Sequence, residues 1–185
     1  MIRNEMSATA TSEGSERTAA DRSRLERMYL THGSAALRLA FLLTGNRTLA
    51  EDIAQDAFAR MAGRLAHLRD PAAFGAYLRQ TVVNLVRMHW RRERLERALL
   101  RRHHEPSIAE LGPDLDLYRD LWSGVQALPP RQRAAIVLHY YEDLSQQSAA
   151  DVLECRPSTY RSLVAQGMKT LRERMGGERD DESGQ

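Results

Sequence analysis

Apolar residues recur at helical spacing along almost the whole chain, and this periodicity constrains the fold more than any other feature. Ile53, Ala57, Phe58, Met61 and Leu65 fall on one face at this spacing and form a single apolar stripe. Strand-like alternation is absent, and β-branched residues are few. The sequence therefore predicts an all-α protein.

Helix-start and helix-end signals divide the first half of the chain into three helices. Gly45–Asn46 predicts the end of the first helix, and the T-x-x-E pattern of Thr48 and Glu51 predicts a capping box at the start of the second. Asp70–Pro71 supplies an N-cap followed by proline at the first helical position. We therefore expect a third helix that runs to about Leu100.

The second half ends in a helix-turn-helix pattern. Leu117–Ala127 and Arg131–Tyr141 are expected to form two helices, with Leu121 facing the core. Ser145 is expected to cap the first helix of the helix-turn-helix, and Pro157 to open the second. This part of the chain therefore predicts a small helical domain of its own.

Charge is distributed unevenly along the chain, although the net charge is only +2. Arg87–His104 holds seven arginines and two glutamates, net +5, whereas Glu105–Asp120 is net −4 and contains prolines and few apolar residues. A basic block beside an acidic break indicates a local phosphate-binding face rather than a uniformly basic protein. The expected organisation is a disordered extension (1–21), a first helical domain (22–102), a flexible acidic linker (103–116), a second domain (117–175) and an acidic tail (176–185).

Several classes of protein are disfavoured. No apolar run approaches 18 residues, so we expect no membrane span, and Met1–Ala20 lacks the apolar core of a secretory signal. Cys155 is the only cysteine, which excludes an intramolecular disulfide and a zinc site built from cysteines. The chain has no glycine-rich phosphate loop, HExxH motif or serine elbow. We expect no enzymatic activity, no cofactor, no metal and no small-molecule substrate.

Two helix faces carry residue types suited to nucleic acid. The second helix of the helix-turn-helix presents a polar face whose arginine could pair with guanine and whose glutamine could pair with adenine. In the basic block Arg87, Arg91, Arg94 and Arg101 lie on one side with Trp90, and these residues could bind phosphates and stack on an unpaired base. Each face could also be an ordinary solvated surface, with Trp90 in the core.

Glu51, Asp52, Gln55 and Asp56 form an acidic cluster on the second helix. It could dock a basic partner, or it could be a solvated face that complements the helix N-terminus. Spacing alone favours the second interpretation.

Three segments together resemble the extracytoplasmic-function (ECF) sigma factors, the small two-domain group of the sigma-70 superfamily. They are LTGNRTLAEDIAQDAFARM, FGAYLRQTVVNLVRMHWRRER and ALPPRQRAAIVLHYYEDLSQQSAADVLECRPSTYRSLVAQGMKTLR. Their order, spacing and linker length make the combination specific, and the resemblance covers roughly Leu25 to Met175. It implies a sigma region 2-like domain followed by a helix-turn-helix domain like region 4.

The resemblance implies a role for each segment. The core polymerase β′ clamp helices would be contacted by Asp52, Gln55, Asp56 and Phe58. Promoter DNA at the −10 element, including a flipped base, would be held by Leu68, Arg69, Phe74, Thr81, Asn84, Arg87, Trp90, Arg91 and Arg92. The −35 element would be contacted by Arg156, Ser158, Thr159, Arg161, Ser162 and Gln166. Leu128–Leu138 would dock on the polymerase β flap, and the acidic linker would enter channels that RNA otherwise uses.

The chain departs from the family pattern at four positions. Glu154 stands in the turn where glycine is usual, and Arg156 stands where serine often caps the recognition helix. Leu163 and Gln166 replace frequent basic residues, which predicts fewer phosphate contacts and a shallower salt dependence of DNA binding.

The resemblance implies a cytoplasmic RNA polymerase sigma factor that directs core polymerase to specific promoters and assists −10 melting. It leaves open whether an anti-sigma factor is a further partner. Two alternatives remain at this point: a stand-alone helix-turn-helix regulator whose N-terminal helices dimerise, and a regulator that only sequesters a polymerase or sigma partner.

Overall fold

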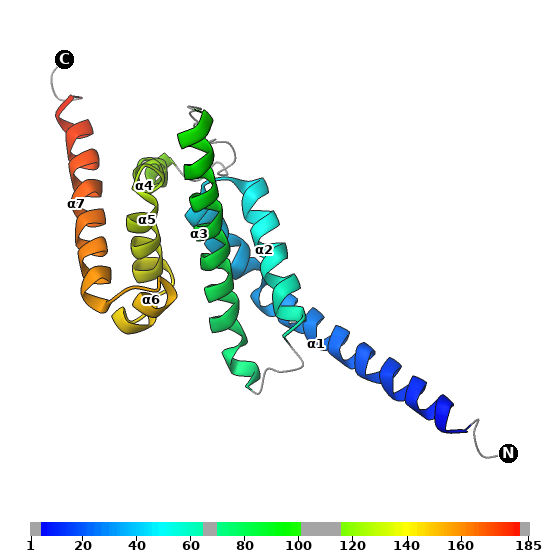
Figure 1. The fold of residues 1–185 in the computed structure, drawn as a ribbon. Helices are drawn as coiled ribbons and strands as arrows, with labels where there is room; N and C mark the ends of the chain where they lie inside the picture. Colours follow the sequence, from blue (N-terminus) through cyan, green and yellow to red (C-terminus); the bar gives the residue numbers. More distant parts are fainter. Residues whose placement is uncertain (1–4, 65–69, 101–115, 182–185) are drawn as a thin grey trace.

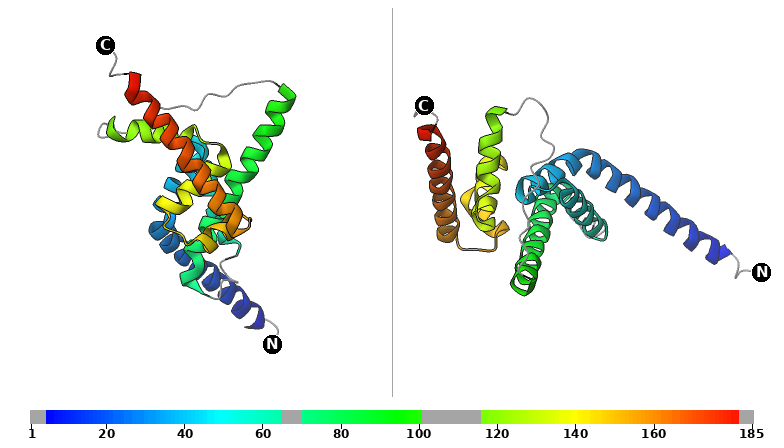
Figure 2. Two further views of the ribbon diagram at one scale, coloured as in Figure 1. Left: turned by 90° about the vertical axis from the view of Figure 1, so that its left-hand side faces the viewer. Right: turned by 90° about the horizontal axis from the view of Figure 1, so that it is seen from above.

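The computed structural model describes residues 5–64, 70–100 and 116–181 of the chain, and every regular element within these ranges is a helix. The helices form two groups that lie side by side, with α1, α2 and α3 in the first and α4 to α7 in the second (Figures 1 and 2). No described helix is both long enough and apolar enough to cross a membrane. The expected linker falls almost entirely outside the described residues.

The first group consists of α1 (Glu5–Thr44), α2 (Arg47–Ala62), a single 3₁₀ turn, η2 (Pro71–Ala73), and α3 (Phe74–Leu100). Leu39, Leu43, Met61, Phe74 and Val82 are at most 2% exposed and form the centre of its core. Burial of each such side chain contributes roughly 1.5–3 kcal/mol. Asp70 Oδ1 accepts a hydrogen bond from Ala72 N at 2.9 Å, so the predicted start of the third helix is confirmed, with one 3₁₀ turn before α3.

The junction between α1 and α2 differs from the expected capping box. Gly45 ends α1 with φ +69°, and Asn46 is the N-cap of α2, its side chain accepting from Leu49 N at 3.0 Å. Thr48 therefore lies inside the helix, and the prediction that it caps α2 is wrong. Asparagine is at least as good an N-cap as threonine, and it follows the glycine turn directly.

The N-terminal end of α1 also differs from expectation. The sequence predicts a disordered extension over 1–21, whereas α1 begins at Glu5. Extending a helix that is already nucleated fixes one residue for each new hydrogen bond, so an alanine-containing segment can continue it without a second nucleation cost.

The second group consists of α4 (Asp116–Gln126), α5 (Pro130–Ile136), the π-helix η3 (Val137–Tyr141), α6 (Gln146–Val152) and α7 (Pro157–Asp181). Ser145 Oγ accepts from Ser148 N at 3.1 Å and Pro157 opens α7, so both predicted helix starts are confirmed. Leu121 is 40% exposed, and the prediction that it faces the core is wrong. Its neighbour Trp122 instead stacks on Phe41 of α1, with ring centroids 4.9 Å apart.

Polar groups of the second group clamp the C-terminal end of α1. Gln126 Nε2 donates to Leu42 O at 3.0 Å, and Arg133 Nη1 donates to Leu43 O at 2.9 Å and to Gln126 Oε1 at 2.7 Å. Carbonyls at a helix C-terminus have no partner within the helix, so these donors satisfy them. Desolvation lowers the pKa of Arg133 to about 10, so its guanidinium remains charged at neutral pH.

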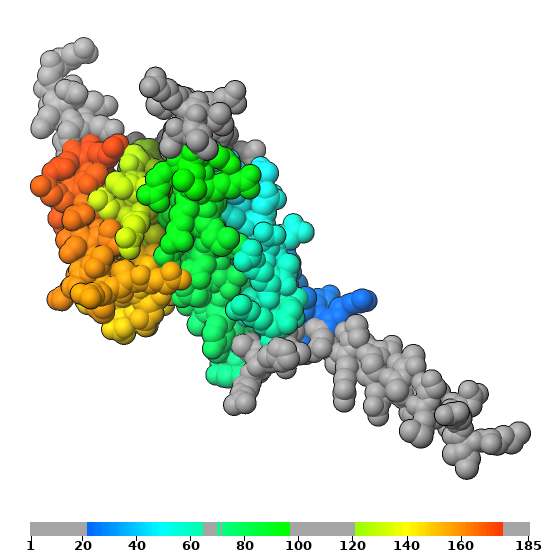
Figure 3. Space-filling model, in the orientation of Figure 1, coloured from blue at the N-terminus to red at the C-terminus, as the bar shows by residue number. Residues whose placement is uncertain are grey.

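The space-filling view shows the second group directly against α3 (Figure 3).

Candidate nucleic-acid interface

The α6–α7 turn and α7 form the first candidate surface. The side chains of Arg156, Ser158, Thr159, Arg161, Ser162 and Gln166 are all exposed, and they occupy the turn and the N-terminal half of α7. The structure thus brings together all six residues that the resemblance assigns to −35 DNA. A recognition helix contacts base edges mainly with its N-terminal residues, so this arrangement has the required geometry.

Tyr160 fixes the opposite face of this helix. It is 1% exposed, and its hydroxyl donates to Ala135 O at 3.2 Å, which ties α7 to α5. Burial, with smaller contributions from Cys155 and Tyr140, raises the pKa of Tyr160 to about 12. Because this face is held in the core, the polar face of α7 points away from it.

The second candidate surface is the polar face of α3. Asn84 Oδ1 accepts from Gln80 Nε2 and from Arg87 Nη1, both at 3.4 Å. Arg91 and Arg92 are exposed, and Arg92 pairs with Glu96 at 2.8 Å. The face therefore combines an amide with several guanidinium groups.

Thr81 and Trp90, on the same helix, are only partly exposed. Thr81 Oγ1 donates to Tyr77 O at 2.8 Å, and Trp90 is half-buried against the core. Trp90 therefore has one part in the core and one part that lines a cleft.

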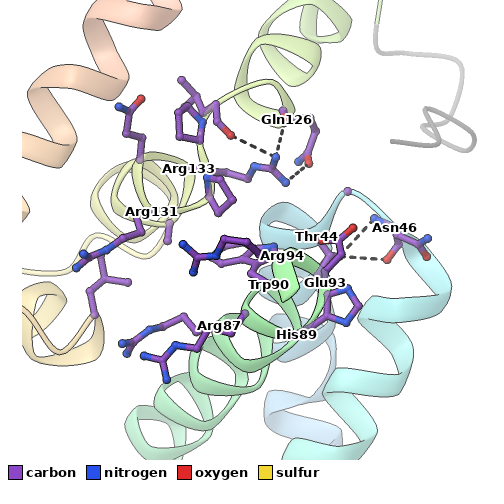
Figure 4. Close-up of a pocket in the computed structure, with 18 of the residues that line it drawn as sticks. Thr44, Asn46, Arg87, His89, Trp90, Glu93, Arg94, Gln126, Arg131 and Arg133 are labelled. Carbon is purple, nitrogen blue, oxygen red and sulfur yellow. Dashed lines mark hydrogen bonds between the residues drawn. The ribbon is translucent and has the colours of Figure 1, made fainter. Parts of the chain in front are cut away.

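This cleft has a volume of about 1540 Å³ and lies between α3, the end of α1 and the start of α5. Its walls include Arg87, Arg91, Arg94 and Arg131, together with Trp90. The close-up shows Arg87, Arg94 and Arg131 directed toward the same open space from α3 and α5 (Figure 4). The walls also hold Glu93, Glu96 and Glu154, but the five arginines, Arg133 included, outnumber these three carboxylates. The opening therefore keeps a net positive charge, which favours phosphate.

Three expected −10 residues do not lie on the described surface. Phe74 is fully buried, with its ring centroid 6.0 Å from that of Phe58. It therefore packs α3 against the core and cannot contact DNA in this conformation. An aromatic side chain at the start of an amphipathic helix gains more by burial than by exposure. Leu68 and Arg69 lie outside the described residues.

The acidic face of α2 is the third candidate surface. Asp52, Gln55 and Asp56 are exposed beside one another on this helix. Phe58, in contrast, is 6% exposed, and its ring meets that of Tyr29 edge-on with the ring centroids 5.0 Å apart. Phe58 therefore belongs to the core beneath the face, because it lies on the apolar stripe of α2. Among the described residues, no group of three or more histidine, cysteine, aspartate or glutamate side chains could hold a metal ion.

Sequence reasoning missed the residues that join the two helix groups. Besides the clamp on α1, Arg79 Nε lies 2.5 Å from Glu142 Oε2, and Arg38 Nε donates to the hydroxyl of Tyr141 at 2.8 Å. Nothing in the spacing of these residues pairs them, since they are separated by 63 and 103 positions.

Comparison with known proteins identifies both groups of helices. The sigma-70 region 2 family matches residues 28–96, and the sigma-70 region 4 family matches residues 118–171. The chain is 30% identical over 148 residues to the RNA polymerase sigma-E factor of Streptomyces coelicolor, which covers 78% of this chain and 82% of that protein. It is 31% identical over 149 residues to the ECF RNA polymerase sigma factor SigE of Mycolicibacterium smegmatis, covering 77% of this chain but only 58% of that protein.

Solved structures give the same fold. The sigma factor RpoE, in complex with the anti-sigma factor NepR from Bartonella quintana, matches with a TM-score of 0.71 and 22% identity over 82% of this chain and 96% of that one. CnrH, in complex with the cytosolic domain of CnrY, matches with a TM-score of 0.58 and 22% identity over 83% and 88%. The matches to the two sigma-70 families and to the sigma-E and SigE relatives place the chain in the extracytoplasmic-function group of the sigma-70 family of sigma factors.

Proposed function

We propose that this chain holds promoter DNA at two places, the −10 element on α3 and the −35 element on α7, while α2 is docked on core polymerase. As a member of its family the chain is an RNA polymerase sigma factor, which directs the polymerase to promoters. In this proposal residues 22–102 form the polymerase and −10 domain and residues 117–175 the −35 domain. The chain acts in the cytoplasm without catalytic activity of its own.

The observation that carries the proposal is the open face of α7. Five polar or charged side chains are exposed together on it, with Arg156 in the turn before it, while Tyr160 anchors the other side of the helix. Arg161 can make a bidentate pair with guanine, and Gln166 can do so with adenine. Ser158 and Ser162 are small, so they allow the helix to approach base edges in the major groove.

The −10 element is assigned to α3 on charge and chemistry. Asn84 offers an amide for a base edge, and Arg87, Arg91 and Arg92 offer guanidinium groups for the backbone. Flipping a base costs a few kcal/mol, and contacts of this kind offset that cost.

Core polymerase is assigned to the acidic face of α2. Asp52, Gln55 and Asp56 are exposed there and would pair with basic groups on the β′ clamp helices. Leu128–Leu138 is assigned to the β flap. We also infer an anti-sigma factor as a further partner, because RpoE, which shares this fold, was solved with one.

The stand-alone regulator is the weaker alternative. It would need a dimer that binds a palindrome without polymerase, whereas the first helical group matches sigma-70 region 2. A regulator that only sequesters a partner would have no use for the exposed polar face of α7.

Run-off transcription with purified core polymerase and fragmented genomic DNA tests the function. Discrete starts that depend on this protein and share two upstream elements at fixed spacing are the expected result. Transcripts that start at the same places without it, and binding to palindromic duplex without polymerase, would support the stand-alone regulator.

Two substitutions separate the surfaces. Arg161→Ala should weaken −35-dependent transcription by about tenfold with core binding unchanged, since one bidentate pair contributes about 1–3 kcal/mol of discrimination. Asp56→Arg should weaken core binding and leave binding to −35 duplex unchanged. The matched controls are Arg174→Ala, an exposed arginine farther along α7, and Glu26→Arg, an exposed acid on α1. Wild-type transcription by both test variants would contradict the site assignment.

A further inference from the structure

The contact between the two domains runs along the face of α3 that we assign to −10 DNA. Glu154 Oε2 lies 3.0 Å from Arg87 Nη2, and Gln80 Nε2 donates to Val152 O at 3.0 Å. Both partners on the second domain come from the end of α6 and the turn that follows it. The Arg87 side chain is left only 19% exposed, so this turn covers part of the −10 face.

Glu154 has an unusual backbone conformation. Its φ is +49°, in the left-handed region, where it is joined by only one other non-glycine residue of the described chain, Asp143. Glycine adopts this conformation without strain, whereas a residue with a Cβ does not. The turn itself does not require a carboxylate, so the glutamate side chain must be explained by what it touches.

The Glu154 side chain pairs with Arg87, one of the guanidinium groups assigned to the DNA backbone. Carboxylate and phosphate oxygens accept from a guanidinium group in the same way. While Glu154 occupies Arg87, a phosphate cannot take the same donor, and its negative charge is repelled.

We propose that Glu154 is an autoinhibitory carboxylate that occupies Arg87 in place of the −10 DNA backbone until the two domains separate. The inference rests on the proposed assignment of −10 DNA to α3. It goes beyond that assignment because it predicts that the free protein withholds one DNA surface through a residue of the other domain.

The closed arrangement is asymmetric with respect to the two promoter elements. The six side chains assigned to −35 DNA remain exposed, whereas Arg87 is covered. The free protein should therefore be able to contact a −35 duplex before the domains separate, and −10 DNA only afterwards. Promoter capture would then follow a fixed order.

A second set of contacts, through residues that are not assigned to DNA, holds the domains together in the wall of the same cleft. Gln126 and Arg133 bind the C-terminal carbonyls of α1, and neither residue is assigned to DNA. Loosening this clamp should expose Arg87 without any change of charge near DNA, which separates domain opening from local electrostatics.

The test measures how tightly the free full-length protein binds a dye-labelled single strand carrying the −10 element of a promoter mapped by run-off transcription. Glu154→Gln should raise the affinity about two- to fivefold at low salt, since an exposed ion pair shifts a two-state equilibrium by about that factor. Glu154→Gly, which also relieves the backbone, should raise it at least as much. Gln126→Ala should raise it in the same direction with the charge unchanged.

Asp151→Asn is the matched control. Asp151 is an exposed acid three residues before Glu154, and its Oδ1 accepts a hydrogen bond from Gln147 Nε2 at 3.0 Å within α6. Its removal should leave −10 affinity nearly unchanged. Equal gains from Glu154→Gln and Asp151→Asn would mean that only general electrostatics changed, and would overturn the proposal. Undetectable binding by Glu154→Gln and Glu154→Gly would overturn it as well.

Arg87→Ala distinguishes this inference from the assignment on which it rests. If holoenzyme with Arg87→Ala opens promoters like wild type, the assignment of Arg87 to DNA fails, and the inference fails with it. If that variant is impaired but Glu154→Gln behaves like Asp151→Asn, only the autoinhibitory contact is refuted. Binding to a −35 duplex should change no more in Glu154→Gln than in Asp151→Asn.

Discussion

Gly45 joins α1, α2 and the second domain at one point, so its replacement by alanine has a calculable cost. Its φ of +69° is strained for any residue with a Cβ, which adds about 1–2 kcal/mol. A Cβ at this position would also lie 2.4 Å from Gln126 Oε1 and 2.9 Å from Gln126 Cδ. Because that amide is buried, it can make room only by leaving its partners.

Displacement of Gln126 would break two hydrogen bonds, one to Leu42 O and one from the charged Arg133. The first contributes about 1 kcal/mol and the second about 2 kcal/mol, because bonds to charged groups are stronger. With the backbone strain, Gly45→Ala should lower the free energy of unfolding by about 4–5 kcal/mol. Urea unfolding followed by far-ultraviolet circular dichroism measures this change.

Two further variants make the reasoning refutable. Gly63→Ala is the control, because φ there is −65° and the nearest atom to a new Cβ is 3.8 Å away. It should change stability by less than about 0.5 kcal/mol. In the double variant Gly45→Ala, Gln126→Ala the clash no longer exists, so the two costs should sum to more than the measured total. Additive costs, or a Gly45→Ala protein as stable as wild type, would refute the steric argument.

Two other predictions concern buried polar groups. Tyr160→Phe removes the hydrogen bond to Ala135 O and should cost about 1 kcal/mol near neutral pH. The folded-state pKa of Tyr160 is raised to about 12 from an ordinary value of 10.0, so wild type should lose stability as pH rises from 10 toward 12. Tyr160→Phe should lack this contribution to the pH dependence. The same dependence of unfolding free energy on alkaline pH in both proteins would contradict the prediction. Arg133→Ala should lower the free energy of unfolding by about 2–4 kcal/mol in urea, because it leaves Leu43 O and Gln126 Oε1 without their donor. Arg131→Ala, an exposed neighbour, should cost under about 0.5 kcal/mol, and equal losses from the two would contradict a clamp.

Local signals in the sequence were sufficient for most helix starts. Ser145, Pro157 and Asp70 act within a few residues of themselves, and their predicted roles are confirmed. The capping box at Thr48 failed because two adjacent signals competed, and Asn46 is the one that follows the glycine turn. Leu121 failed for a different reason, since α4 turns Trp122 toward α1 and the sequence of α4 contains no information about α1.

The candidate site was predictable where one helix supplies it. All six residues assigned to −35 DNA lie on the exposed surface of the turn and of α7, because helical periodicity fixes which residues share a face. The −10 surface was harder, because it is a face of α3 that the other domain partly covers. The pairing of Arg87 with Glu154 joins residues 67 positions apart, and no local pattern encodes it.

The kind of contact between the domains explains how a closed form can also open. Ion pairs, hydrogen bonds to backbone oxygens and the stack of Phe41 on Trp122 join the two helix groups, and one buried apolar cluster also contains residues of both, among them Leu39 and Val86 of the first and Ala135 and Leu138 of the second. Water can replace the polar partners when the domains separate, whereas apolar side chains of the shared cluster would lose their burial. The contacts that a partner makes with the open form therefore have to offset the exposure of this apolar surface. Arg87 can then be exposed by a partner whose differential affinity for the open form exceeds the cost of separating the domains.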